Sequence, residues 1–111
     1  MRRVDLLAVD QVPPGTMKMA WVDGTDQVLV VNLDGDIRAY QGICTHEYFE
    51  LDKGFLTAGS ITCALHLSRF DLADGEPLDP PAEVALAVYP VVIDGGRILI
   101  EIPDGPLPIN E

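Results

Sequence analysis

The sequence is poor in the residues that form disulfides, bind metals or contact nucleic acids. Its 111 residues include two cysteines, two histidines and seven basic residues against 18 acidic ones, and the formal net charge is −11. Nucleic acids and anionic membrane surfaces both require basic patches, so this composition excludes them as partners. Two cysteines are also too few for a disulfide-stabilised scaffold. A basic patch on a partner protein is a compatible target.

Long apolar runs are lacking as well. The longest nearly apolar stretch, residues 84–93, is about half the length of a membrane-spanning helix, and Pro90 interrupts it. Asp5 and Asp10 follow the basic Arg2-Arg3 pair, where a secretory signal would continue with apolar residues. We therefore expect a cytoplasmic protein without a membrane segment.

The sequence does contain enough apolar residues for one hydrophobic core. They make up 48% of the chain, which excludes disorder, and the length fits a single domain over residues 1–111. Turn signals recur between short strand-like runs. The expected strands are residues 17–22, 27–32, 36–41, 60–63, 68–72, 84–93 and 97–102, with at most a short helical turn in residues 6–11.

The middle of the chain differs from its two ends. Residues 28–31 and 98–100 are strongly apolar, which predicts burial on at least one face. Residues 43–81 are polar and turn-rich, and they contain every cysteine and histidine. The expected fold is therefore all-β, an antiparallel β-sandwich base with a small inserted subdomain over residues 43–81. A single barrel with long loops is the alternative.

The cysteines and histidines form two matched groups. The first is Cys44-Thr45-His46, and the second, after sixteen residues, is Cys63-Ala64-Leu65-His66. Thiolates and imidazoles are ligands for transition metals, so two such loops can enclose one small inorganic centre. A [2Fe–2S] cluster suits loops that each contribute one cysteine and one histidine, because each loop then supplies one ligand to each iron.

Other interpretations of the four residues are open from the residues alone. A zinc site can use two cysteines and two histidines, although its usual spacing places cysteine with cysteine and histidine with histidine. A catalytic cysteine–histidine dyad does not explain why the pattern occurs twice. The simplest alternative is two buried cysteines and two hydrogen-bonded histidines within the core.

The two motifs resemble the ligand loops of Rieske ferredoxins, and in particular the small ferredoxins of bacterial aromatic-ring oxygenases such as the biphenyl dioxygenase and toluene monooxygenase systems. The resemblance covers essentially the whole chain. Beyond the two motifs it includes residues 12–15, 51–54, 55–61 and 70–75, the Pro80-Pro81 pair, and residues 86–96.

This resemblance implies a cofactor, ligands and partners. It implies one Rieske-type [2Fe–2S] cluster, with Cys44 and Cys63 on one iron and His46 and His66 on the other. The implied role is a monomeric electron carrier rather than an enzyme, working between a flavin-dependent reductase and a terminal oxygenase component. The alternatives are a small subunit of an assimilatory nitrite reductase, a structural zinc module and a redox sensor.

The sequence also bears on the reduction potential. Both cysteines serve as ligands, so none is left for the disulfide that high-potential Rieske proteins form beside the cluster. Those proteins also place serine and tyrosine hydroxyls where this chain has Ser68 and Phe70. Ser68 can donate a hydrogen bond but Phe70 cannot. We therefore expect a value toward the low end of the Rieske range of roughly −150 to +300 mV.

Acidic residues are concentrated around the predicted ligands. Residues 44–83 contain eight acidic and two basic side chains, or −6 over 40 residues, whereas the other 71 residues carry −5. Such a charge can steer the protein onto basic docking sites, although loop solvation alone also accounts for it. Tyr48 and Phe49, directly after the first motif, suit either a partner contact or core packing.

Overall fold

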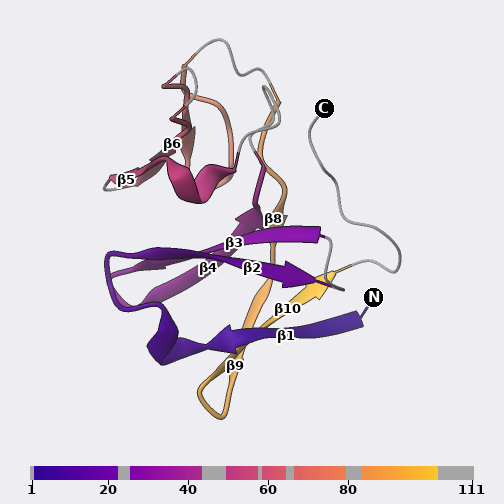
Figure 1. Cartoon of the computed structure of the whole chain (residues 1–111). Helices are drawn as coiled ribbons and strands as arrows, with labels where there is room; N and C mark the ends of the chain where they lie inside the picture. The colour runs from indigo at the N-terminus through magenta and orange to yellow at the C-terminus, as the bar shows by residue number, and fades with distance from the viewer. Residues whose placement is uncertain are drawn as a thin grey trace.

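The computed structural model describes residues 2–22, 26–43, 50–57, 59–64, 67–79 and 84–102. Within these ranges the chain forms ten strands in three antiparallel sheets, which confirms the predicted all-β class (Figure 1). Its helical segments in the described ranges are two single turns of 3-10 helix, Val9–Gln11 (η1) and Leu51–Lys53 (η2). No helix in the described ranges is long and apolar enough to cross a membrane.

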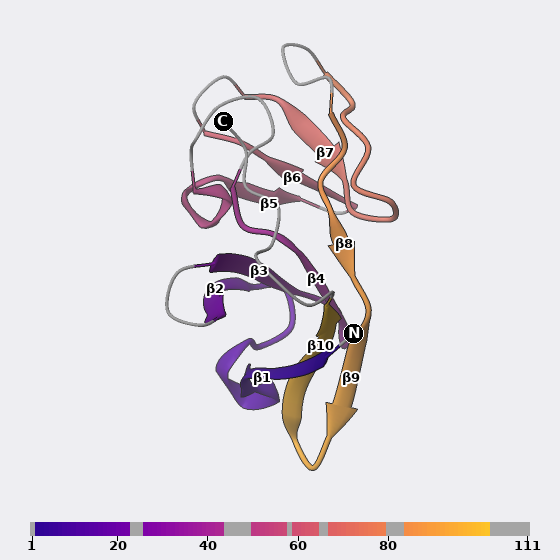
Figure 2. The same cartoon turned by 90° about the vertical axis from the view of Figure 1, so that its right-hand side faces the viewer.

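Two of the sheets form the base of the molecule, in the lower part of Figures 1 and 2. One sheet has the order β1-β10-β9 and the other β2-β3-β4-β8. The strands of the first are β1 (Arg2–Ala8), β9 (Val91–Asp94) and β10 (Arg97–Ile102). Those of the second are β2 (Met17–Val22), β3 (Asp26–Leu33), β4 (Asp36–Gln41) and β8 (Val88–Tyr89).

Strand β3 is the centre of the core because four consecutive apolar residues, 28–31, are fully buried. A strand directs successive side chains to opposite faces, so burial of all four requires packing on both sides. On one face Val30 packs in a cluster with Ile98 of β10, inside the sandwich. On the other face Leu29 packs with Ile61 and Phe70 of the third sheet. The expected burial of residues 28–31 is thus confirmed.

The third sheet is small and lies above the base in Figure 2. It contains β5 (Phe55–Thr57), β6 (Ser60–Thr62) and β7 (Arg69–Asp71) in sequential order. Strands β6 and β7 lie within the expected ranges 60–63 and 68–72, and they pair as an antiparallel hairpin. Apolar side chains from all its parts pack onto Leu29 and Tyr40 of the base, so the two regions share one hydrophobic cluster.

The structure differs from the expected elements in three details. The expected helical turn in residues 6–11 is confined to Val9–Gln11, and residues 6–8 belong to β1, which pairs with β10 near the other end of the chain. Residues 84–93 are not one strand, since Pro90 separates β8, which pairs with β4, from β9, which pairs with β10. Strand β5 was not expected at all, and its three residues are ordered by pairing with β6.

Candidate metal centre

The first predicted ligand loop begins and ends on strongly fixed backbone. Cys44 and His46, together with Tyr48 and Phe49, lie outside the described residues. Ile43 before the loop and Glu50 after it form an antiparallel bridge, and the amide of Leu51 donates to the carbonyl oxygen of Gly42 at 2.9 Å. Both Ile43 and Leu51 are buried. The two ends of the loop therefore lie side by side on the protein core.

The second predicted ligand loop is closed in the same way. Its first ligand, Cys63, directly follows β6 and is buried within the shared hydrophobic cluster. Its amide donates to the carbonyl oxygen of Ser68 at 2.8 Å, and its carbonyl oxygen accepts from the amide of Leu67 at 2.9 Å. These bonds join the two ends of the loop, and the second predicted histidine ligand, His66, lies outside the described residues.

Ser68 is fully buried, and its hydroxyl has no hydrogen-bond partner among the described residues. A buried hydroxyl without a partner is unfavourable for folding, because it has left water without replacing the hydrogen bonds it made there. The hydroxyl lies one residue beyond Leu67 in the strand-like segment that closes the second loop. An acceptor supplied by a bound group would satisfy it.

The donors present fit a Rieske-type cluster. Cys63 offers a buried thiol, Ser68 an unpartnered hydroxyl, and Phe70 occupies the next inward position as a fully buried ring. The described residues alone gather no set of three or more cysteine, histidine or acidic side chains suited to a metal ion. The placement of the full ligand set, Cys44, His46, Cys63 and His66, therefore stays a prediction from the sequence.

The segments that lead into and out of the third sheet meet at Gln41, which hydrogen-bonds to both. Its backbone amide donates to the carbonyl oxygen of Ala87 at 2.9 Å, and its side-chain oxygen accepts from the amide of Ala87 at 2.7 Å. Its side-chain nitrogen donates to the carbonyl oxygen of Ile43 at 2.9 Å. One buried amide thus binds both connecting segments. Sequence analysis missed this residue, because a lone glutamine at a strand end carries no recognisable pattern.

A second connection joins the base to the end of β7. The Tyr40 hydroxyl and the Arg38 guanidinium, both on β4, donate to the carbonyl oxygen of Leu72, with the Arg38 bond at 3.0 Å. Burial raises the pKa of Tyr40, and the hydrogen bond from Arg38 opposes part of that effect. The phenol therefore stays protonated and able to donate at neutral pH.

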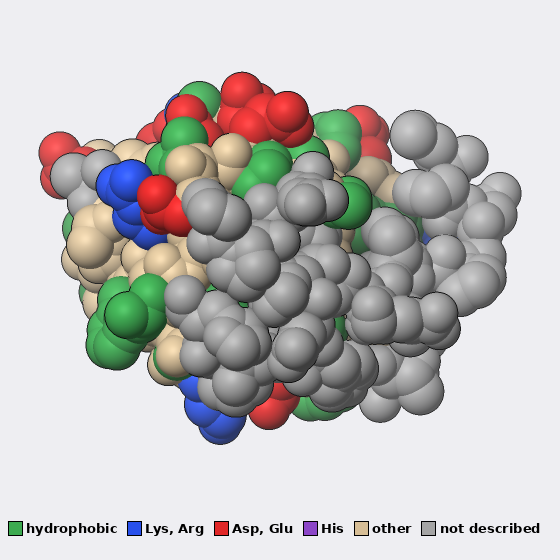
Figure 3. Space-filling view, turned by 90° about the horizontal axis from the view of Figure 1, so that it is seen from above, with side chains coloured by type: hydrophobic (Ala, Val, Ile, Leu, Met, Phe, Trp, Pro, Cys, Tyr) green, Lys and Arg blue, Asp and Glu red, His purple; other side chains and the backbone are tan. Residues whose placement is uncertain are grey.

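The surface of this end of the molecule is acidic. In residues 50–57, 59–64 and 67–79 there are six acidic and two basic side chains, which gives −4. Arg69 forms a two-bond ion pair with Asp79, at 2.6 and 3.1 Å, so its charge is neutralised locally. This hydrogen bond holds the pKa of Asp79 below its usual value. Figure 3 shows acidic side chains gathered along one edge, with hydrophobic ones among them.

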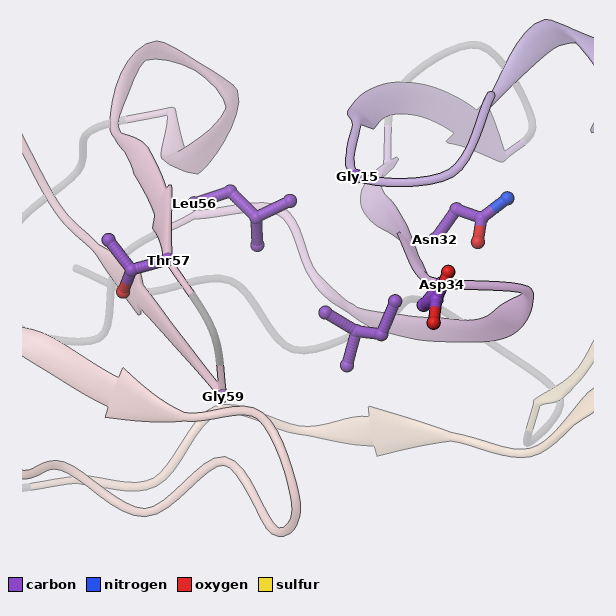
Figure 4. Close-up of a pocket in the computed structure, with 7 residues that line it drawn as sticks. Gly15, Asn32, Asp34, Leu56, Thr57 and Gly59 are labelled. Carbon is purple, nitrogen blue, oxygen red and sulfur yellow. The ribbon is translucent and has the colours of Figure 1, made fainter.

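A separate pocket of about 390 Å³ lies where the third sheet meets the base. Leu56 extends from β5 toward Gly15, which precedes β2, and toward Asn32 and Asp34 at the end of β3 (Figure 4). The Asn32 side chain is engaged within the fold, because it donates to Val12 and accepts from Gly35. The pocket therefore presents few free polar groups, and Cys63, the one predicted ligand among the described residues, does not line it.

Comparison with known proteins agrees with the motif. A family model described as the Rieske [2Fe-2S] domain matches residues 2–90. The ferredoxin component of a naphthalene 1,2-dioxygenase system from Pseudomonas aeruginosa is 33% identical over 99 residues, covering 89% of this chain and 94% of the relative. The ferredoxin component of an alkene monooxygenase system from Xanthobacter autotrophicus is 39% identical, covering 87% and 79%.

Solved structures give the same result. The Sphingomonas yanoikuyae B1 ferredoxin has a TM-score of 0.86 at 27% identity, covering 92% of this chain and all of that one. A chain from the complex of oxygenase and ferredoxin in carbazole 1,9a-dioxygenase has a TM-score of 0.82 at 26% identity, covering 88% and 91%. A Mycobacterium tuberculosis protein described as an NADH-dependent nitrite reductase small subunit has a TM-score of 0.74 at 25% identity, covering 89% and 93%. The chain therefore belongs to the Rieske [2Fe–2S] domain family, and one Rieske-type [2Fe–2S] cluster is its cofactor.

Proposed function

We propose that this protein is the electron-carrying ferredoxin of a multicomponent oxygenase. It accepts electrons from a flavin-dependent reductase and passes them one at a time to a terminal oxygenase component, so it is a carrier rather than an enzyme. The observation that carries this proposal is the alignment over most of both chains with ferredoxin components of dioxygenase and monooxygenase systems. A structural relative is itself solved in complex with its oxygenase.

In this proposal Cys44 and Cys63 bind one iron, and His46 and His66 bind the other. Residues 43–81 form the cluster-binding subdomain within a single Rieske domain of residues 1–111. The closed ends of both ligand loops and the burial of Cys63 support this arrangement. A pre-closed loop presents its ligands without a further loss of chain entropy when the cluster binds.

When bound, a Rieske cluster supplies reversible one-electron redox chemistry at a potential set by its surroundings. The residues of this chain control those surroundings. Burial of Cys63 and Phe70 limits access of water, and the Ser68 hydroxyl offers a hydrogen bond. The acidic surface attracts basic patches on partner proteins over a distance of about 10 Å at 0.1 M salt, which favours rapid and transient association.

The first test is cofactor content. Protein purified under nitrogen is expected to be red-brown, to contain two irons and two sulfides per chain, and to give a paramagnetic resonance signal when reduced. Alanine at any one of Cys44, His46, Cys63 or His66 should abolish that signal. Thr62→Ala, one residue before Cys63, is the matched control and should retain it. A colourless protein that contains only zinc would overturn the assignment.

The second test is electron transfer. The protein should couple a flavin-dependent reductase to a terminal oxygenase, and the rate should fall as salt rises because exposed charges are screened. Coupling that does not depend on salt would contradict the role given to the acidic surface. Failure to couple any oxygenase, with an intact cluster, would instead favour a redox sensor.

The nitrite reductase alternative has weaker support, since its structural likeness is lower than that of the ferredoxins. A shuttle and a fixed subunit also differ in solution behaviour. We expect a monomer in the cytoplasm that associates transiently with its partners. Stable co-purification with a nitrite reductase would favour the alternative.

A further inference from the structure

One residue beside the proposed cluster has two features that do not help the protein to fold. Leu67 has a φ of +59°, in the left-handed region that L-residues with bulky side chains avoid. Its side chain is also 63% exposed. Among the described residues, Asp34 is the other non-glycine residue with positive φ, and a short polar side chain of that kind is tolerated there.

The left-handed backbone at Leu67 follows from closure of the second ligand loop. Its amide donates to the carbonyl oxygen of Cys63, while the next residue, Ser68, accepts from the amide of Cys63 and is fully buried. Glycine would adopt this backbone without strain. The leucine side chain therefore adds strain to a conformation the loop requires, and being exposed it adds little to the core.

The surroundings of Leu67 have the composition of a docking site. Leu78, 47% exposed, lies across from Arg69, two residues beyond Leu67, and its amide donates to the Arg69 carbonyl oxygen at 2.7 Å. Arg69 is neutralised by Asp79. The exposed Asp74 and Glu76 belong to the same hairpin but lie at its far end, beyond Asp71. An apolar centre in a region whose described residues carry a net charge of −4 matches an apolar recess among basic side chains.

We propose that Leu67 is the apolar anchor by which this protein docks on its terminal oxygenase, in an apolar recess bordered by lysine or arginine side chains. This inference rests on the proposed function. The oxygenase is the chosen partner because a protein with this fold is solved in complex with one. Leu67 directly follows His66, so docking through its side chain brings a proposed cluster ligand to the partner surface.

The test compares two substitutions that separate the side chain from the backbone strain. Leu67→Gly removes both, whereas Leu67→Ala removes most of the side chain and keeps the strain. Ile93→Ala is the matched control, because Ile93 is an apolar residue of similar size, 49% exposed, on β9 at the opposite end of the molecule (Figure 1). Holoprotein is used throughout, with the Kd for the oxygenase, the rate of reduction by the reductase, the reduction potential and the thermal midpoint measured.

Both Leu67 variants are expected to bind the oxygenase about tenfold more weakly or worse, since burial of a leucine side chain is lost. Reduction by the reductase and the behaviour of Ile93→Ala should be unchanged. Leu67→Gly should unfold at a temperature no lower than the original protein, while Leu67→Ala should gain nothing. A variant that is at least as stable as the original protein but docks more weakly identifies an anchor.

Three results would overturn the proposal: unchanged oxygenase affinity in both variants, a loss seen only with the reductase, or a shift confined to the potential, which would make Leu67 a cover for the cluster. Failure of the proposed function is distinct from all three. In that case the original protein itself would not reduce the oxygenase.

Discussion

The base and the third sheet are stabilised in different ways. In the base, β1–β10 and β2–β3 each pair over six registered positions, and β3 carries four consecutive buried residues. The strands of the third sheet are three residues long. Beyond the hydrophobic cluster that it shares with the base, its order depends on close backbone contacts and on hydrogen bonds from the base, such as that of Tyr40 to the Leu72 carbonyl.

Because of this difference, substitutions should affect the base and the third sheet differently. Apolar burial in the base is non-directional and tolerates substitutions of similar volume. Close backbone contacts and single hydrogen bonds are directional, so small changes near β5–β7 should have large and local effects. Substitutions in the third sheet should therefore change cluster retention before they change the stability of the base.

The largest expected effect is at Gly54, between η2 and β5. A Cβ atom there would overlap the carbonyl oxygen of Thr62 on β6, and backbone cannot move aside as a side chain can. Gly54→Ala should lower the free energy of unfolding by about 3 kcal/mol and reduce iron content. Denaturant unfolding and iron analysis measure both.

Gly59 provides the matched control for Gly54, because it lies in the same sheet with open space around its Cβ position and a φ of +84°. Gly59→Ala should cost about 1 kcal/mol from backbone strain alone and should retain iron. Equal effects at the two glycines would contradict the role given to the close contact.

Gln41→Leu tests the connection between the two regions. The substitution leaves the Ala87 amide and the Ile43 carbonyl without their side-chain partners, with an expected loss of about 2 kcal/mol. Hydrogen exchange should increase in β5–β7 more than in β3. Gln41→Glu keeps the acceptor for the Ala87 amide but loses the donor to the Ile43 carbonyl oxygen. Its free energy of unfolding should lie between those of the original protein and Gln41→Leu. A uniform increase across both regions would show that they unfold as one unit.

Ser68→Ala probes the cluster environment without disturbing the fold. The hydroxyl has no partner among the residues that the structure describes, so its removal should not lower the stability of the fold. If it donates to a cluster sulfur, the potential should fall by roughly 20–65 mV, the equivalent of one hydrogen bond. Voltammetry at pH 7 should place the unsubstituted protein nearer −150 than +300 mV, within the roughly −150 to +300 mV Rieske range. An unchanged potential in the variant would mean a hydroxyl that does not contact the cluster.

The smallest effects are expected from two exposed ion pairs, one in each region. Hydrogen bonds from Arg97 and Arg69 lower the pKa values of Asp5 and Asp79 respectively. A lowered native pKa gives stability that is present above the unfolded value of about 3.9 and is lost as pH falls through the native pKa. Asp5→Asn and Asp79→Asn should thus shift acid unfolding only slightly, because both pairs are exposed. A shift that persists in high salt would contradict this expectation.

Much of the base could be predicted from the sequence. Strands β2, β3 and β4 lie within one residue of the expected ranges, because each combines an apolar run with tight flanking turns. Strand β1 alternates apolar residues with Arg3 and Asp5, and its partner is far away in the chain. Its order comes from pairing with β10, which local patterns do not contain.

For the site, the sequence predicts the cofactor but not the residues that fix the backbone around it. The spacing of the two motifs is specific enough to predict the cluster and its family, and the family match confirms both. The roles of Gln41 and Leu67 depend on which backbone groups meet in three dimensions. Neither the hydrogen bonds between Gln41 and Ala87 nor the left-handed φ of Leu67 can be recognised from the amino-acid sequence.

The hydrogen bonds at Gln41 have a consequence for how such a protein can be rebuilt. Gln41 and Ala87 are 46 positions apart, yet they meet in a closed pair of bonds at the foot of the inserted segment. The segment between them therefore behaves as a cassette with adjoining ends. Exchanging this segment for the corresponding segment of another family member requires only that the hydrogen bonds between positions 41 and 87 are kept. The β-sheet base need not be redesigned.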